Sequence, residues 1–256
     1  MHSISIFSLL LAAGMLVSAR PSAPGPILRR ELSEDDIILF SNDGRVEVMA
    51  KEAYFAELSA SNVTVGPPDG EQTVPTEVDG DSEEAASTNE TLSRRCSSYK
   101  IFKNNAVSNF LNWDVPMSSV VHATGGTNTI AVTAGYQISN SLGVSESADF
   151  TIVKDYLSAS YGITYTQTWT STYAAAYTFT IPSGKYGAVV SNPKTVRHSG
   201  SVSVGCVGSW SRKSTFQGDS YSSKAYGGLS WVDGTISLCT GNSYPLPRCI
   251  GSGTIS

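Results

Sequence analysis

Few residues in the long C-terminal part of the chain have the types and spacing that acid–base or nucleophilic chemistry requires. His122 and His198 both lie among polar, loop-forming residues, where a solvated histidine is the expected role. Sequence order leaves a Ser–His–Asp triad open, but no Gly-x-Ser-x-Gly elbow occurs. Asp149 and Asp155 could form a carboxylate pair, yet solvated acids at strand ends are the simpler interpretation. We therefore predict no catalytic residues and a protein that is not an enzyme.

Sites for metals, cofactors and nucleic acids are not indicated either. The sequence has no glycine-rich phosphate-binding loop, and its basic residues are too scattered to form a nucleic-acid patch. None of the cysteine spacings matches a Cys-x-x-Cys motif for zinc or redox chemistry. We expect no cofactor, no bound metal and no nucleic-acid partner.

The four cysteines predict two disulfides, as is usual for a protein of an oxidising compartment. Three connectivities are possible. Cys239 and Cys249 flank a short loop that a local bond could close. That choice leaves Cys96 to pair with Cys206, which would join the start of the C-terminal part to its sheet.

The cysteine-containing part of the chain is preceded by an N-terminal leader. Residues 1–19 have the pattern of a secretory signal peptide, with an apolar run from Ile4 to Val17 that is too short to span a bilayer. Val17-Ser18-Ala19 supplies the small residues that precede a cleavage site. We therefore expect a secreted, extracellular protein.

Charge is divided unevenly along the rest of the chain. The formal net charge is −5 overall, but it is −12 for residues 31–95 and +4 for residues 96–256. The dibasic pairs Arg29-Arg30 and Arg94-Arg95 lie at the boundaries of these compositions, and the second directly precedes Cys96. This arrangement predicts processing by a secretory-pathway convertase, so residues 20–95 resemble a propeptide.

The propeptide-like part has two sections. In residues 20–60, Ile37–Phe40 and Arg45–Met49 flank an Asp-Gly turn and predict a β-hairpin. A short helix over residues 51–58 should follow, giving a ββα unit that is too small to be stable alone. Residues 61–95 are rich in Pro, Ser, Thr and acids, which is typical of a disordered acidic linker, and they contain glycosylation sequons at Asn62 and Asn89.

Residues 96–256 have the composition of an all-β domain. From Tyr161 to Ile181 most odd positions are apolar and most even positions are threonine, a period of two that indicates a strand. We expect one unusually long strand, or one that bends near residues 174–176, with Lys185 to Ser191 as its partner. Other strands are expected over residues 129–136, 148–153, 201–207 and 229–238, and helix only as a turn near 107–111. The predicted fold is an antiparallel sandwich or an elongated sheet with long Thr/Tyr-alternating strands.

Four segments carry a resemblance to a known family. They are Asp36–Met49, Asn112–Met117, Tyr165–Ser171 and Gly184–Gly187. They are similar to segments of the secreted ascomycete proteins described as Celp effector-like, and the resemblance covers most of the chain after the signal peptide. It implies fungal secretion and a candidate effector role, and it supplies no catalytic residues.

A second resemblance concerns shape. Ser/Thr-alternating strands followed by an aromatic strand and the turn Pro182-Ser183-Gly184 are similar to the pattern of aerolysin-type β-pore-forming proteins, over about residues 127–193. In such proteins an amphipathic hairpin enters lipid and needs about 9–11 residues per crossing. Residues 139–151 and 161–181 are long enough. The same alternation suits a half-buried sheet in water, which we take as the preferred interpretation.

These observations lead to a secreted, non-enzymatic binding protein or effector. Its target would be extracellular or on a host, and could be a protein, a glycan or a membrane. A membrane-acting or pore-forming protein is the alternative, and a secreted enzyme is the third interpretation.

Overall fold

The computed structural model of the chain describes residues 31–40, 46–61, 63–68, 99–145, 149–172, 174–206, 209–226 and 229–256. The predicted signal peptide, both dibasic pairs, both sequon asparagines and Cys96 lie outside these ranges, and only the backbone of Cys206 is described.

The described chain is mostly β, as the composition predicted, with two helices. The helices are α1 (Lys51–Ala60) and α2 (Phe150–Tyr161). The strands before α2 are β1 (Glu31–Leu32), β2 (Asp36–Phe40), β3 (Val46–Ala50), β4 (Thr64–Val65), β5 (Tyr99–Asn104), β6 (Ser108–Leu111), β7 (Val115–Pro116), β8 (Val121–His122), β9 (Asn128–Val132), β10 (Gln137–Ser139) and β11 (Ser141–Val144). Those after it are β12 (Thr168–Thr170), β13 (Ala174–Ile181), β14 (Tyr186–Cys206), β15 (Ser209–Ser220), β16 (Ser223–Tyr226), β17 (Leu229–Val232), β18 (Gly234–Gly241), β19 (Leu246–Pro247) and β20 (Thr254–Ile255).

One strand, β14, organises the molecule. It has 21 residues and belongs to an 11-stranded sheet. The main path through this sheet has the order β11-β15-β14-β18-β2-β3, and the short strands β4 to β8 lie off that path. The antiparallel strands β18 and β15 lie along one edge of β14, and β8, β7, β6 and β5 follow one another along the other. Gly200 lies where β5 and β15 flank β14, and a methyl group there would overlap the carbonyl oxygen of Lys103. Glycine therefore allows the close approach of these strands.

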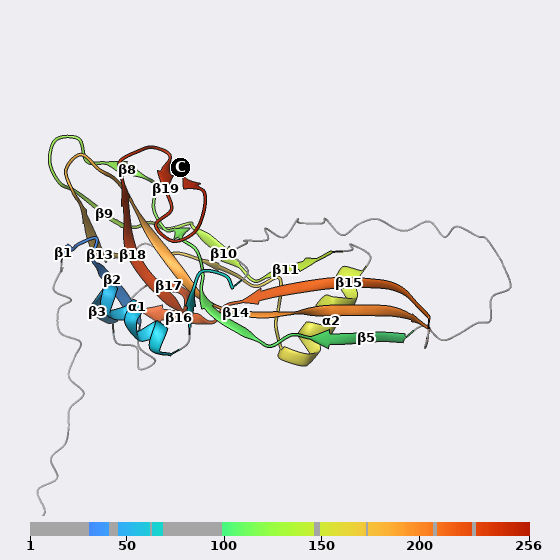
Figure 1. Ribbon diagram of the computed structural model, residues 1–256. Helices are drawn as coiled ribbons and strands as arrows, with labels where there is room; N and C mark the ends of the chain where they lie inside the picture. The colour runs from blue at the N-terminus through green and yellow to red at the C-terminus, as the bar shows by residue number, and fades with distance from the viewer. Residues whose placement is uncertain are drawn as a thin grey trace, which may run out of the picture.

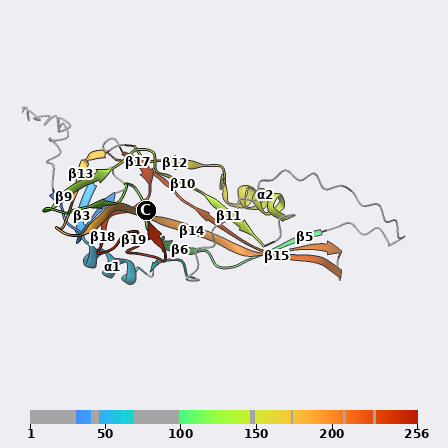
Figure 2. The same cartoon turned by 90° about the horizontal axis from the view of Figure 1, so that it is seen from above.

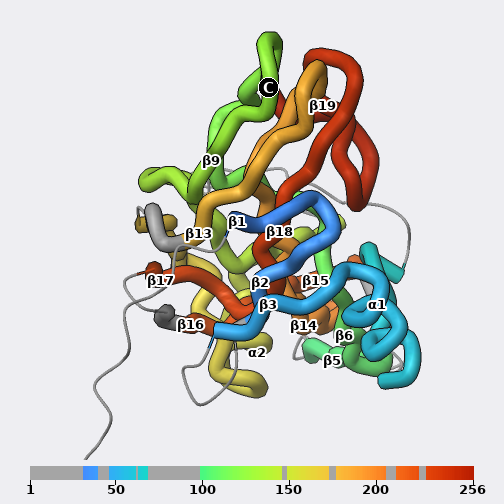
Figure 3. Tube along the Cα trace, turned by 90° about the vertical axis from the view of Figure 1, so that its left-hand side faces the viewer, coloured from blue at the N-terminus to red at the C-terminus, as the bar shows by residue number. Residues whose placement is uncertain are grey.

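The molecule is elongated, with a wide end and a narrow end (Figures 1 and 2). β1, β2, β3, β9, β13, β18 and α1 gather at the wide end, which faces the viewer in Figure 3. Its core contains Ile38, Phe179, Trp231 and Leu238. At the narrow end α2 covers β14 and β15, where Leu157, Val202 and Phe216 form a second core.

A continuous strand over Tyr161–Ile181 is wrong, because two breaks divide the segment. The second break lies between β12 and β13, just before the alternative bend expected near residues 174–176. Gly162, in the left-handed conformation at φ 68°, ends α2, and a turn separates that helix from β12. Between β12 and β13 the chain bends where the buried Ser171 hydroxyl donates to Thr133 O and accepts from the Tyr136 amide. The alternation itself is retained, since the apolar odd positions 163, 169, 177, 179 and 181 are buried while Thr168 and Thr170 are exposed.

Three other expectations are also corrected. Lys185–Ser191 does not pair with β13, which lies between β1 and β9, because this part of β14 pairs with β18 instead. Residues 150–153 begin α2 rather than a strand, since Val153 and Leu157 pack on the narrow-end core. Residues 108–111 form strand β6, which buries Phe110 and Leu111 against β14. The N-terminal hairpin and helix are found as β2, β3 and α1.

Candidate functional site

His122 and His198 lie in aromatic contacts rather than in a catalytic group. The His122 ring stacks on Tyr186 at 4.0 Å between centroids, and the His198 ring lies 4.0 Å from Tyr161. Burial lowers the pKa of His198. Among the described residues neither histidine has a hydrogen bond or an ion pair to a carboxylate, so no Ser–His–Asp arrangement forms around them there.

Asp149 and Asp155 have different surroundings and do not act as a carboxylate pair. Asp149 is fully buried just before α2, and its carboxylate faces β15. Arg212 lies 3.1 Å from Asp149 Oδ1, and the hydroxyl of Ser214 donates a hydrogen bond to Oδ2. Asp155 is exposed on α2. The role of Asp149 is to attach the start of α2 to the sheet.

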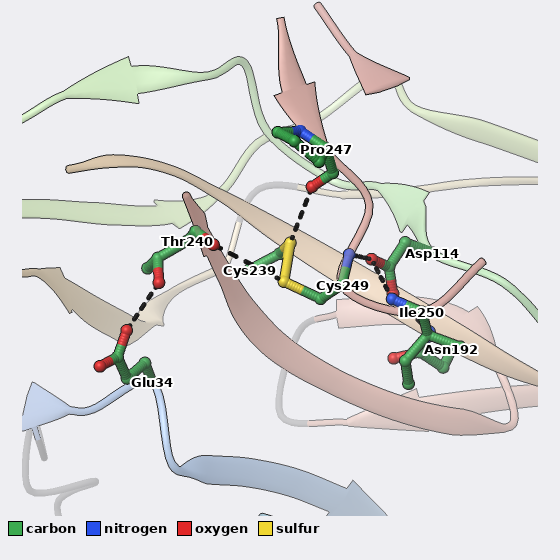
Figure 4. Close-up of a disulfide and its surroundings, with 8 residues drawn as sticks. All are labelled: Glu34, Asp114, Asn192, Cys239, Thr240, Pro247, Cys249 and Ile250. Carbon is green, nitrogen blue, oxygen red and sulfur yellow. Dashed lines mark hydrogen bonds between the residues drawn. A yellow bond between two sulfur atoms is a disulfide. The ribbon is translucent and has the colours of Figure 1, made fainter. Parts of the chain in front are cut away.

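The described part of the chain contains a cluster of side chains that are close enough together to bind a metal ion. It consists of Asp114, Cys239 and Cys249, whose candidate ligand atoms lie within 4.8 Å of one another. The two sulfurs are bonded to one another, which confirms the expected local disulfide (Figure 4). Asp114 accepts hydrogen bonds from the backbone amides of Cys249 at 2.7 Å and Ile250 at 3.0 Å, and from Asn192. A bonded cystine cannot supply thiolate ligands, so this cluster fixes the C-terminal loop. The predicted Cys96–Cys206 pairing is not described, because Cys96 lies outside the described residues and only the backbone of Cys206 is described.

A buried ion pair links two register partners on the neighbouring strands β14 and β15. The Arg197 guanidinium donates to Asp219 from Nε at 2.7 Å and from Nη2 at 2.8 Å, and it lies over the Phe110 ring. Burial raises the pKa of the neighbouring Tyr221 to about 12, and the charge of Asp219 acts in the same direction. The buried charges of Arg197 and Asp219 are paired and hydrogen-bonded to one another, which indicates a structural role.

A shallow cavity of about 150 Å³ lies between α1 and the strands β6 and β14. Tyr54, Glu57, Leu111 and Lys194 are among its lining residues. Small-molecule sites usually have volumes of roughly 300–1,000 Å³. The cavity therefore marks the contact of α1 with the sheet and does not suggest a ligand.

The segment that stands out is residues 137–170, which leaves the middle of the molecule, reaches the narrow end and returns. β10, β11 and α2 follow one another along this path, and β12 closes it (Figures 1 and 2). β10 and β12 form an antiparallel pair with Gln137 opposite Thr170, Ile138 opposite Trp169 and Ser139 opposite Thr168. The amide of Asn140 donates to Gln167 O at 3.2 Å and continues the same register by one pair. The base of the segment is thus an antiparallel pair of strands.

Side chains outside the segment hold α2 at both ends. At its C-terminal end the Asn104 amide donates to Tyr156 Oη at 2.6 Å and to Tyr161 Oη at 2.9 Å. The Tyr156 ring also stacks on Phe102 at 3.7 Å. At its start the buried Asp149 is bound by Arg212 and Ser214, and no side-chain cap bond is formed. The helix therefore depends on these tertiary contacts.

Other parts of the segment are less firmly held. β11 pairs with β15 on one side only within the described residues, so it is an edge strand. Burial raises the pKa of Tyr165, whose hydroxyl is enclosed beside Gly218 and has no hydrogen-bond partner in the described structure. A buried hydroxyl left without a partner costs about 1–3 kcal/mol.

Comparisons with protein families, curated proteins and solved structures find no match to this chain. No helix in the described ranges is long and apolar enough to span a bilayer.

Sequence reasoning predicted strands over residues 148–153 and 161–181 and missed α2, which begins at Phe150 within the first range and ends at Tyr161 where the second begins. The residues that hold α2, Asn104 and Arg212, are distant in sequence and carry no local signal.

Proposed function

We propose that this is a secreted, non-enzymatic protein that acts on membranes, and that residues 137–170 are the segment that enters lipid. The observation that carries the proposal is the register of β10 with β12. When this register is continued along both arms, it pairs apolar residues with apolar residues and small polar residues with small polar residues.

The pairs can be read directly from the sequence. The apolar pairs are Ile138–Trp169, Leu142–Tyr165, Val144–Ile163, Ala148–Ala159 and Phe150–Leu157. The small and polar pairs are Ser139–Thr168, Ser141–Thr166, Gly143–Thr164, Ser145–Gly162 and Ser147–Ser160. Asn140–Gln167, Glu146–Tyr161 and Ile152–Asp155 interrupt the apolar set, and Thr151–Tyr156 interrupts the polar set near the tip. Since successive strand residues face opposite sides, the extended hairpin would have one apolar and one polar face.

Such a hairpin suits a bilayer in length and in pattern. Each arm is longer than the about 9–11 residues that a tilted strand needs to cross. A single hairpin would leave unpaired backbone groups in lipid, which is costly, so several copies must insert side by side. The partners are therefore a lipid bilayer and further copies of this chain, and the polar faces would line an aqueous pore.

Insertion requires a defined change from the described conformation. The edge strand β11 must leave β15, and α2 must unfold so that residues 150–161 extend both arms. The contacts of Asp149 and Asn104 oppose this change, while the unpartnered Tyr165 hydroxyl favours it.

A soluble binding protein or effector is the second candidate. The apolar side chains Leu142, Val153 and Leu157 are already buried at the narrow end, as a stable water-soluble sheet requires. The resemblance to Celp effector-like proteins is compatible with either candidate, since a secreted effector can act on a host protein, glycan or membrane.

Two adjacent α2 residues provide the test. Ala159 and Ser160 are both exposed in the folded chain, but they would face opposite sides of the extended hairpin. Ala159→Glu should reduce dye release from anionic lipid vesicles by the full-length chain, uncut and cut after Arg95, at least tenfold, because a charge on a lipid-facing position is costly. Ser160→Glu should release dye as the wild type does. Equal circular dichroism and thermal midpoints would show that both variants fold.

A reversible lock tests the same change independently. Gly143 and Gln217 are register partners on β11 and β15, so Gly143→Cys with Gln217→Cys should form a disulfide at antiparallel spacing. The oxidised protein should be inactive and the reduced protein active, with reduced wild type as the control. Absence of wild-type dye release in both cut and uncut forms, or equal activity of the Ala159→Glu and Ser160→Glu variants, would favour the soluble binding protein.

A further inference from the structure

The N-terminal segment 31–68 is built into the fold at three separate places. β1 pairs in parallel with β13, β2 pairs antiparallel with β18, and β4 pairs in parallel with β6. These three partner strands all belong to the part of the chain after residue 98. The segment thus crosses the wide end, where its strands and α1 lie beside the C-terminal strands (Figure 3).

Buried apolar side chains accompany each pairing. Leu32 and Ile38 belong to the wide-end core with Phe179, Ile236 and Leu238. Ile37 is also almost fully buried. Without residues 31–68 the edge of β18 and the apolar residues beneath it would face water, and the isolated segment would expose its own apolar side chains as well.

Polar contacts fix the same segment at both ends. The Thr180 hydroxyl donates to Glu31 Oε1 at 2.7 Å, and the Thr240 hydroxyl donates to Glu34 Oε2 at 2.6 Å. Further along, the amide of Gly66 donates to Leu111 O at 2.8 Å. These bonds join residues 31–68 to β13, β18 and β6.

From these contacts we propose that a cut between residues 69 and 98, such as one after Arg95, leaves a two-chain protein. Residues 31–68 remain bound as the strand-donating partner of residues 99–256 and are not released as a propeptide. The interface consists of the strand edges of β18, β13 and β6 that β2, β1 and β4 cover, and its partner is this segment of the same chain. The proposal does not depend on membrane activity.

The test uses the full-length chain with a site-specific protease sequence inserted between Asp79 and Gly80. After complete cutting, verified on a denaturing gel, the two pieces should elute together on size exclusion at the position of the uncut protein. They should separate in 6 M guanidinium chloride. Elution of the N-terminal piece as a separate soluble species, whether the remainder stays monomeric or aggregates, would overturn the proposal.

Two variants make the test specific to the interface. Ile37→Ala shortens a buried β2 side chain, whereas Glu47→Ala changes an exposed position of β3. In the cut protein, Ile37→Ala should lower the denaturant concentration at which the pieces separate, and Glu47→Ala should leave it unchanged. An equal midpoint for all three cut proteins would show that the strand contacts do not hold the segment.

Discussion

At the scale of single residues, Tyr221 connects burial to pH dependence. Its hydroxyl accepts a hydrogen bond from Asn112, and burial raises its pKa from 10.0 to about 12. A pKa that is higher in the folded than in the unfolded chain means that folding favours the neutral phenol. The resulting stability is complete below pH 10 and is lost as the pH rises through about 12.

We therefore expect the free energy of unfolding to fall steeply from pH 10 to pH 12, and less steeply in Tyr221→Phe. Urea denaturation at a series of pH values measures both slopes. Tyr244→Phe, at an exposed position, is the matched control and should retain the wild-type slope. A Tyr221→Phe slope equal to that of the wild type would contradict the assignment.

At the scale of elements, the two faces of β12 differ in burial. Trp169 is 7% exposed and contacts the Tyr221 ring edge-on at 6.1 Å, whereas Thr170 is exposed. Trp169→Asp should lower the free energy of unfolding by about 3–5 kcal/mol, because it removes a buried ring and places a charge in the core. Thr170→Asp should change it by less than about 0.5 kcal/mol. Chemical denaturation measures both, and equal losses would contradict the assigned faces.

The elements also show which features the sequence could predict. The β2–β3 hairpin follows from a local turn signal between two apolar runs. The alternation of residues 161–181 correctly predicted burial at positions 163, 169, 177, 179 and 181 and exposure of Thr168 and Thr170, whereas Tyr161 is exposed. The sequence analysis missed α2, although Phe150, Val153 and Leu157 recur at the helical spacing of three and four residues. Leu157, Ala159 and Tyr161 also alternate with serine, which is typical of a strand, and α2 is further stabilised by distant contacts with Val202, Val204 and Asn104. The same residues therefore suit a helix in the fold and a strand in the proposed hairpin. The proposed strand pairing of these residues is derived by continuing the observed β10–β12 register.

At the scale of the whole molecule, β14 and the segment 137–170 should differ in local stability. β14 has strands on both edges along much of its length, whereas β11 is an edge strand in the described structure and α2 buries only Val153 and Leu157 deeply. Regions with fewer buried contacts open at lower free energy than the global transition. The proposed membrane insertion requires such a partial opening.

Hydrogen exchange of the full-length chain in water measures this difference. We expect the amides of β11 and α2 to exchange through a local opening at least tenfold faster than those of β14 and β18. Asn104→Ala should accelerate exchange in α2 further, because it removes the bonds to Tyr156 and Tyr161, and it should leave β18 unchanged. Ser243→Ala, in an exposed loop at the wide end, is the control and should alter neither region. If α2 exchanged only together with β14, the segment would be an integral part of the sheet's cooperative unit, and insertion would require unfolding of the whole molecule.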